Sequence, residues 1–584
     1  MNIYLYIMSL PEAFLICALC LLLVFGVLSW PKENLKIVAP MFYARPFARF
    51  VSLRRNKQAV EKKKLQFGSG LSGEFFATSD MLFQRHLAIS RDQSKLSVLI
   101  DGLAQIKRFS WLGLHTLLIT FYLVFMQVSV FDKLIFLNFF VVDSYAVYLK
   151  LLILIATCII LVLTSQLKKV IYSFELVLLI LFATLGMLLL VSSYNLLSFY
   201  LALELQSFAL YILAALRRDS EFSTEAGLKY FILGAFASGF LLFGISLIYG
   251  FSGTLHFEEL FRLLCLSTYE VLPGEVLFFS SIHSVGLLVG FTFVFVGLLF
   301  KLGAVPFHMW LPDVYEGAPL IVTCFFAVVP KIAIFGLCCR LLFNTFYSLP
   351  ELPLNDYFSL VLQPILFFSA FGSILLACFV GLKQKKIKRL IAYSAMGHVG
   401  YMLLGVLSGS IAGLSAIFLY LIIYAITSLG LFSLTLSTLQ FKGITTPNKS
   451  KNLIFIGDLY LVASSNPLLG ITFATILFSM AGIPPLSGFI AKFILFFASF
   501  NAGVYFLTSV AILASVISCF FYIRFVKNAT FVLEKFNSIS PVFYSISCAH
   551  SIILGCVIFF LLFFILYPGP LFLFAHNLAF LFVF

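Results

Sequence analysis

The sequence predicts an all-α membrane protein of about 14 transmembrane helices, and three observations support this fold class. Of the 584 residues, 62% are hydrophobic and only 11% are charged. Apolar runs of about 20 residues, the length that spans a bilayer as a helix, recur along the chain. Two of these runs are interrupted by prolines close to a lysine. Because unpaired backbone groups cannot face lipid, and the alternating pattern of a barrel strand does not occur, we expect a helical bundle.

The apolar runs place the expected helices in order. They lie near residues 5–30, 111–131, 145–166, 171–193, 196–216, 226–250, 282–304, 319–340, 357–381, 390–408, 411–438, 468–500, 503–523 and 545–568. We group them into a first helix (1–30), a basic polar insertion (31–110), helices two and three (111–170), two five-helix units (171–345 and 357–527), and a last helix with the C-terminus (545–584).

The first run reads as a retained helix, because no basic segment precedes it and no small-residue cleavage site follows it. The eleven cysteines are scattered, and those that are close together lie inside apolar runs. They are typical of packing residues rather than metal ligands. With no phosphate-binding glycine motif and no complete ligand set, the chain is expected to bind no nucleotide, haem or iron–sulfur cluster.

The insertion 31–110 carries fifteen Lys and Arg against six Asp and Glu. A polyanion-binding tail would explain this charge, but a basic loop on one face of a membrane explains it more simply. With fourteen spans, 30 of the 38 basic residues fall on the side of this loop. Lys133, Arg262 and Arg340 alone fall on the opposite side. The positive-inside rule then places the basic loops in the cytosol or matrix and both termini outside.

Five lysines remain inside the predicted spans, and among the carboxylates only Glu204 lies near the middle of one; the lysines are Lys150, Lys229, Lys301, Lys331 and Lys492. A charge in the hydrocarbon core costs a few kcal/mol, roughly 2.5–3.5 at a helix centre, and is therefore a functional hypothesis by default. Lys150 lies near a helix end, where snorkelling to the headgroups is the simpler explanation. A helix pair with Glu225, four residues earlier, accounts equally well for Lys229. Glu204 and Lys331 lie mid-span, where neither explanation applies.

Prolines follow Lys301 and precede Lys492, at Pro306 and at Pro484-Pro485. Proline removes a backbone hydrogen bond, so the seventh and twelfth helices should be discontinuous at membrane depth. Spans 4–8 and 9–13 then form two five-helix repeats, each with a broken fourth helix. An odd number of helices makes the second repeat inverted, as in transporters with ion sites at broken helices.

Lysine suits a proton path, because loss of water favours its neutral form and a nearby carboxylate restores the charged form. Arginine does not release its proton in proteins. Glu204 beside a lysine would therefore be a switchable pair. His308 and His398 are further candidates, either as proton relays or as caps of carbonyls freed by the helix breaks.

Four stretches resemble the antiporter-like membrane subunits of respiratory complex I, especially their mitochondrial forms. They are LELQS at 203–207, STEAGLKYF at 223–231, FK at 300–301 with VPFHMWLPDVYEGAP at 305–319, and AGIPP at 481–485 with GFIAKF at 488–493. The resemblance covers the chain from about residue 111 to the end. Residues 31–110 match no family pattern.

The resemblance implies a fourteen-helix fold and a proton route through Glu204, Lys229, Lys301, Lys331 and Lys492. It also implies that NADH, FMN, iron–sulfur clusters and ubiquinone bind to other subunits, so that this chain contributes proton pumping to NADH:ubiquinone reductase. The expected partners are neighbouring antiporter-like and small membrane subunits and lipids, with no nucleic acid. The expected location is the mitochondrial inner membrane, with both termini in the intermembrane space and the insertion in the matrix.

Two alternatives remain open from the sequence. A cation/proton antiporter shares the same fold, and it would purify without flavin and iron–sulfur subunits. A membrane scaffold with no transport role would tolerate apolar replacement of Glu204 or Lys301.

Overall fold

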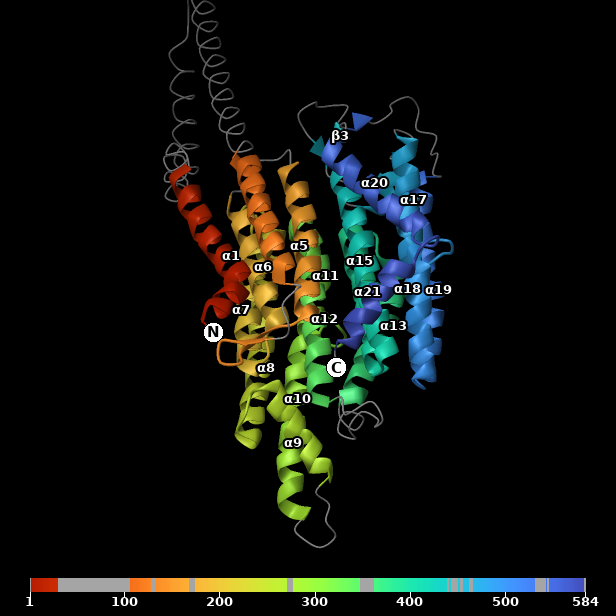
Figure 1. The fold of residues 1–584 in the computed structure, drawn as a ribbon. Helices are drawn as coiled ribbons and strands as arrows, with labels where there is room; N and C mark the ends of the chain where they lie inside the picture. The colour runs from red at the N-terminus through yellow and green to blue at the C-terminus, as the bar shows by residue number, and fades with distance from the viewer. Residues whose placement is uncertain are drawn as a thin grey trace, which may run out of the picture.

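Long apolar helices, roughly parallel to one another in Figure 1, make up most of the computed structural model. The structure describes residues 2–29, 105–127, 133–166, 174–269, 277–346, 362–438, 441–442, 450–451, 455–461, 466–530, 542–543 and 546–581. Most of the basic insertion 31–110 therefore lies outside the described residues.

Within these ranges, 12 helices are long and apolar enough to cross a membrane. The first seven are α1 (Asn2–Ser29), the helix Gln105–Met126, α5 (Ser144–Ser165), α6 (Glu175–Ser192), α7 (Leu196–Ala214), α8 (Glu221–Ser252) and α10 (Leu277–Leu302). The others are α12 (Leu320–Phe346), α13 (Gln363–Lys383), α14 (Ile387–Leu407), α15 (Ile411–Thr438) and α19 (Tyr505–Thr530). The expected all-helical membrane fold is confirmed.

Shorter helices complete the described part of the bundle. They are α9 (Phe257–Tyr269), α11 (Trp310–Gly317), α17 (Pro467–Ala481), α18 (Ser487–Asn501), α20 (Cys548–Phe563), α21 (Gly569–Phe580) and the 3₁₀ helix η3 (Ile456–Leu461). Two small antiparallel sheets lie in the connections. One is the hairpin of β1 (Lys133–Ile135) and β2 (Phe140–Val142), and the other joins β4 (Ser450–Lys451), β3 (Phe441–Lys442) and β5 (Val542–Phe543), in that order.

Two of the expected spans are interrupted where the sequence predicts a break. α10 ends at Leu302, Gly303 follows with φ of 73°, and α11 begins only at Trp310. α17 ends at Ala481, Gly482 follows with φ of 84°, and α18 begins at Ser487. Glycine adopts this left-handed conformation without strain, and the prolines that follow cannot supply helical N–H donors.

A third interruption lies between α20 and α21. The sequence did not predict it, because the last expected span ends near residue 568. Pro568 and Pro570 flank the start of α21, so the helix stops at Phe563 and resumes at Gly569. Both α20 and α21 contact α15. The apolar face of this C-terminal segment therefore packs along the bundle beyond the predicted end.

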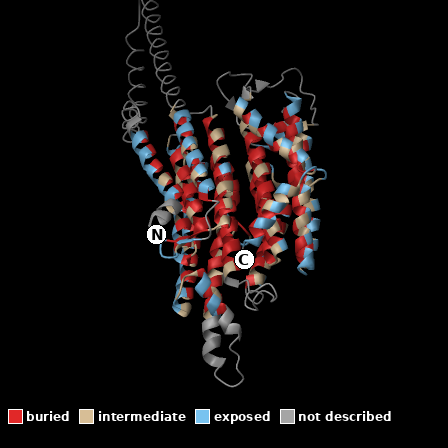
Figure 2. Ribbon diagram, in the orientation of Figure 1, coloured by how far each residue is buried: buried red, intermediate tan, exposed pale blue. Residues whose placement is uncertain are grey.

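The three helices α12, α14 and α15 form the centre of the bundle. Within their apolar windows 100%, 89% and 94% of residues are buried, against 33% in α8 (Figure 2). α12 stays continuous through Pro330 and contacts α5, α6 and α15. Polar side chains in the middle of these helices are thus shielded from lipid by protein on all sides.

Candidate functional site

Glu204 on α7 and Lys301 at the end of α10 face each other. The Lys301 Nζ and a Glu204 carboxylate oxygen lie 4.0 Å apart, with side chains 5% and 16% exposed. Lys301 donates instead to the Tyr211 hydroxyl at 3.1 Å, and Ser207 donates to the Glu204 carboxylate at 3.2 Å. The structure thus brings together the carboxylate and lysine that the sequence predicts as a switchable pair.

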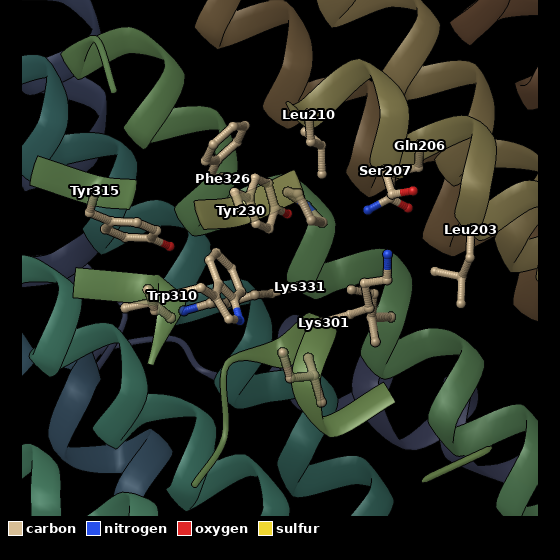
Figure 3. A pocket seen from close by; sticks show the side chains of 14 residues that line it. Leu203, Gln206, Ser207, Leu210, Tyr230, Lys301, Trp310, Tyr315, Phe326 and Lys331 are labelled. Carbon is tan, nitrogen blue, oxygen red and sulfur yellow. The ribbon is translucent and has the colours of Figure 1, made fainter. Parts of the chain in front are cut away.

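A small cavity lies between Lys301 and the centre of the bundle. It measures about 20 Å³, enough for a water molecule or two, and is lined by residues of α7, α8, α10, α11 and α12. In Figure 3 the Lys301 side chain points toward Gln206 and Ser207. The Gln206 side-chain oxygen is buried and accepts no hydrogen bond from the described residues. The cavity therefore offers polar partners for water beside Lys301.

Lys331 lines the same cavity from α12. It is 3% exposed, and its ammonium donates to the Tyr424 hydroxyl at 2.9 Å and to the Ala395 carbonyl at 3.2 Å. Tyr424 in turn donates to the Ala327 carbonyl at 3.1 Å. Lys331 therefore connects the cavity to α14 and α15, and no ion pair joins it to a carboxylate of the described residues.

His398 on α14 lies between two tyrosine hydroxyls. Its Nδ1 is 2.7 Å from the Tyr420 hydroxyl and its Nε2 is 3.4 Å from the Tyr522 hydroxyl. The imidazole centre lies 5.0 Å from that of the Tyr424 ring, which accepts the Lys331 contact. With tyrosine hydroxyls rather than carbonyls at both nitrogens, the geometry favours the relay alternative for His398.

Lys492 on α18 lies at the end of the preceding half-helix. It is 6% exposed and donates to the carbonyls of Met480 and Ala481 at 3.1 and 2.7 Å. These are carbonyls that the break after α17 leaves without helical partners. The negative end of a helix dipole favours a cation at this point. The Lys492 ammonium also lies 5.4 Å from the centre of the Tyr401 ring, beside His398.

The two remaining predicted site residues, Lys229 and His308, lie apart from the buried side chains described above. Lys229 is 43% exposed and pairs with Glu225 and with Asp313 of α11, each at 2.8 Å. The helix pair with Glu225 is confirmed, whereas the contact with Asp313 was not predicted. His308 lies in the connection before α11, where its Nδ1 is 3.3 Å from the Pro306 carbonyl. That position favours the carbonyl-capping alternative for His308.

Two predictions about basic residues are wrong. Lys150 does not snorkel: it is 1% exposed and pairs with Glu12 of α1 at 2.5 Å. Arg340 does not lie in a loop, because α12 continues to Phe346 and buries it. There Arg340 binds both carboxylate oxygens of Asp143 at 2.8 and 2.9 Å. The basic residues inside the spans are thus not all lysines, because Arg340 is one of them.

The family model for the membrane-spanning part of NADH:quinone oxidoreductase and Mrp antiporter subunits matches residues 193–518, more than half of the chain. The chain belongs to this family.

Members of the NADH:quinone oxidoreductase/Mrp antiporter family from plants and bacteria are similar over most of the chain. NADH-ubiquinone oxidoreductase chain 2 of Marchantia polymorpha is 42% identical, covering 81% of this chain and 91% of the relative. NADH-quinone oxidoreductase subunit N 1 of Rhizobium meliloti is 41% identical, covering 66% and 75%. The expected resemblance to antiporter-like complex I subunits is confirmed, and these relatives are subunits of an enzyme complex.

Solved structures of the same family share the fold. A chain of respiratory complex I from Thermus thermophilus, with bound aureothin, is 27% identical with a TM-score of 0.62, covering 81% of this chain and 98% of that one. A chain of the Mrp complex from Dietzia is 19% identical with a TM-score of 0.63, covering 86% and 96%. The latter likeness shows the fold alone.

Sequence reasoning missed the residues that connect the predicted ones. They are the tyrosines at positions 211, 401, 420, 424 and 522, together with Glu12. Tyr420 and Tyr424 are four residues apart on α15 and so share one helix face. This spacing on one helix is a signal that could have found Tyr420 and Tyr424, but not the other four residues.

Proposed function

We propose that this chain is a proton-translocating membrane subunit of a respiratory NADH–quinone oxidoreductase. The observation that supports this most is a row of buried polar side chains through the centre of the bundle. It starts at Glu204 and Lys301, crosses the cavity to Lys331, and continues through the tyrosines around His398 to Lys492. We call these residues the central row. Redox cofactors and quinone would bind to other subunits.

The contacts in the central row suggest how a proton would pass between its members. Glu204 and Lys301 are close enough to stabilise each other's charge, yet not joined by a direct hydrogen bond. Lys301 is therefore free to exchange its proton with water in the cavity. Lys331 lies on the far wall of that cavity, where its ammonium donates to the Tyr424 hydroxyl and the Ala395 carbonyl. A proton leaving Lys301 would thus reach Lys331 through one or two water molecules.

The second half of the row depends on tyrosine and histidine. A hydroxyl both donates and accepts a hydrogen bond, and a neutral imidazole donates at one ring nitrogen and accepts at the other, so Tyr424, Tyr420 and Tyr522 around His398 would form a path for protons. Lys492 would be the last proton acceptor of the central row. Its counter-charge is the carbonyl end of α17 rather than a carboxylate of the described residues.

Lys229 would supply protons to the central row from outside it. Its carboxylate partners are partly exposed, and the next residue, Tyr230, lines the cavity. The broken helices, five spans apart, favour two inverted repeats within fourteen spans, with α17 and α18 together as the twelfth. The charge bias favours basic loops in the matrix and both termini in the intermembrane space of mitochondria. Neighbouring membrane subunits of the complex and lipid would cover the exposed apolar faces.

Proton pumping measured beside NADH oxidation in a Lys301→Ala complex tests the proposal. We expect the complex to assemble and proton pumping to be lost; pumping at the parent level would overturn the relay.

The family model that matches residues 193–518 includes Mrp antiporter subunits, which supports a second candidate, a cation/proton antiporter subunit. The proteins that co-purify with this chain distinguish the two candidate functions. A subunit of NADH–quinone oxidoreductase should co-purify with flavin and iron–sulfur subunits, whereas an antiporter subunit should not.

A further inference from the structure

The half-helix α11 has only eight residues, too few for a helix to be stable by itself. Its position must therefore come from its contacts with the rest of the protein. One face of α11 lines the cavity beside Lys301, through Trp310, Leu311 and Tyr315. The other face carries the carboxylates Asp313 and Glu316, which are part of ion pairs to the helices on either side.

On one side, α11 is pressed against the start of α8. A side chain at Gly317 would meet the Phe222 carbonyl oxygen at 2.2 Å, so the two backbones approach as closely as glycine allows. Lys229 of α8 pairs with Asp313 at 2.8 Å. At the other end of α11, Trp310 stacks on Tyr230 of α8 with ring centres 4.6 Å apart. A shift of α11 would therefore disturb the aromatic wall of the cavity.

On the other side, three basic residues at the start of α14 hold the C-terminal end of α11. We call Lys386, Lys388 and Arg389 the basic clamp. Lys386 and Arg389 both form ion pairs with Glu316. Lys388 donates to the carbonyls of Glu316 and Ala318 at 3.2 and 2.6 Å. A helix C-terminus carries partial negative charge, so the clamp meets both the carboxylate and the end of the helix dipole.

These ion pairs are strong enough to position a short helix and weak enough to open. The side chains of Lys386 and Arg389 are 37% and 39% exposed, and ion pairs that face water contribute little individually. The Glu316 side chain is less exposed, at 18%, and forms ion pairs with both of these basic residues. Replacing Glu316 would therefore remove both of its ion pairs at once, while Arg389 would keep its pair with Asp313 at 3.2 Å and Lys388 its bonds to backbone carbonyls.

We propose that Glu316 is a positioning residue that holds α11 as a gate over the Lys301 cavity. With the basic clamp closed on Glu316, α11 separates the cavity from the aqueous phase on the side of the basic loops. When the clamp releases, α11 moves and the cavity opens to that phase. The inference deepens the proposed function and rests on it, because the cavity matters only if protons pass through it.

Thiol labelling in the intact complex, in sealed membrane vesicles, tests the gate. A cysteine replaces Leu210, which lines the cavity and is 4% exposed, and a membrane-impermeant maleimide is added on the side of the basic loops. A matched control carries the cysteine at Leu154 of α5, which is buried but does not line the cavity. The labelling of native cysteines in the parent complex is subtracted. Glu316→Gln, Glu316→Asp and Lys386→Gln are compared in both backgrounds.

In Glu316→Gln we expect labelling at position 210 to rise at least about tenfold, because the rate reports the population of the open state. Labelling at position 154 should stay unchanged, and Glu316→Asp should remain close to the parent. Lys386→Gln should add little to Glu316→Gln, since both act through one contact. Unchanged labelling at 210, or an equal rise at 154, overturns the gate. Labelling requires no pumping, so a failed gate leaves the relay standing, and a failed Lys301→Ala test leaves the labelling result readable.

Discussion

The Lys301 ammonium and the Glu204 carboxylate lie 4.0 Å apart, too far for a hydrogen bond but close enough for each to stabilise the other's charge. Each has a second partner, Tyr211 for Lys301 and Ser207 for Glu204. The pair is therefore held in place by neighbours rather than by its own contact. A pair of this kind can change its distance at little cost, which is what a switchable proton site requires.

Glu204→Gln should assemble and lose most of its proton pumping. The amide fills the same space and keeps the Ser207 contact, but it removes the negative charge that stabilises protonated Lys301. We expect pumping per assembled complex to fall at least about tenfold, equivalent to about 1.4 kcal/mol in the barrier. Acidification of vesicles during NADH oxidation measures this. Glu204→Asp is the control and should retain more activity than Glu204→Gln; equal activity in both variants would contradict the role of the charge.

His398→Gln should interrupt the path between Lys331 and Lys492. Glutamine keeps hydrogen bonds to the surrounding tyrosines, but it cannot take up and release a proton. Pumping should fall about tenfold or more, in the range usual for loss of a positioned proton-transfer group. His308→Gln is the matched control, because that ring is hydrogen-bonded to the Pro306 carbonyl and lies outside the central row. A larger loss in His308→Gln than in His398→Gln would reverse the two assignments.

Gly482→Ala should destabilise the twelfth span and displace Lys492. The φ of 84° costs a non-glycine residue about 1–2 kcal/mol. The added methyl would also lie 2.9 Å from Lys492 Cδ and 3.2 Å from its Nζ. We expect a lower Tm of the complex and weaker pumping. Gly250→Ala is the control, since beyond the adjacent turns of its own helix no atom of the described residues lies within 4 Å of a methyl group there. A Gly482→Ala complex with parental Tm and pumping would show that this close contact is unimportant.

Glu12→Ala should reduce assembly without affecting the pumping of complexes that do assemble. It leaves the buried Lys150 without its carboxylate, a change that typically costs about 3–5 kcal/mol. The amount of chain in the assembled complex, measured by native electrophoresis, should fall. The double replacement Glu12→Leu with Lys150→Leu should recover much of the loss, because no uncompensated charge remains. A double variant that assembles worse than Glu12→Ala would argue against this explanation.

The positions of the helices and of the buried charges could be predicted from the sequence, because apolar length and the cost of membrane charge act locally. Lys301 and Lys492 were found as charges inside apolar runs, the prolines beside them predicted helix breaks, and the structure places both lysines at broken helices. The contacts between distant helices were not predictable. Lys150 and Glu12 are 138 residues apart, and a single sequence shows which face of a helix is polar but not which helix meets it.

Arg340 shows how a charge at the end of an apolar run can lead to a wrong prediction of where a helix ends. Its charge ends an apolar run, so the sequence favours a loop, yet α12 continues to Phe346 because Asp143 neutralises the guanidinium. The tyrosines around His398 were missed for a related reason. Tyrosine is common in apolar helices, and only the surrounding packing distinguishes a hydroxyl on a polar row from one at a helix surface.

The central claim is that Lys301 works by releasing a proton, and Lys301→Arg tests it most directly. Arginine keeps the positive charge opposite Glu204 but does not lose its proton in proteins. Lys150→Arg is the matched control, because Lys150 is also a buried lysine facing a glutamate but lies outside the central row. NADH-driven proton pumping, normalised to assembled complex, should be lost in Lys301→Arg and retained in Lys150→Arg. Full pumping in Lys301→Arg would contradict the relay.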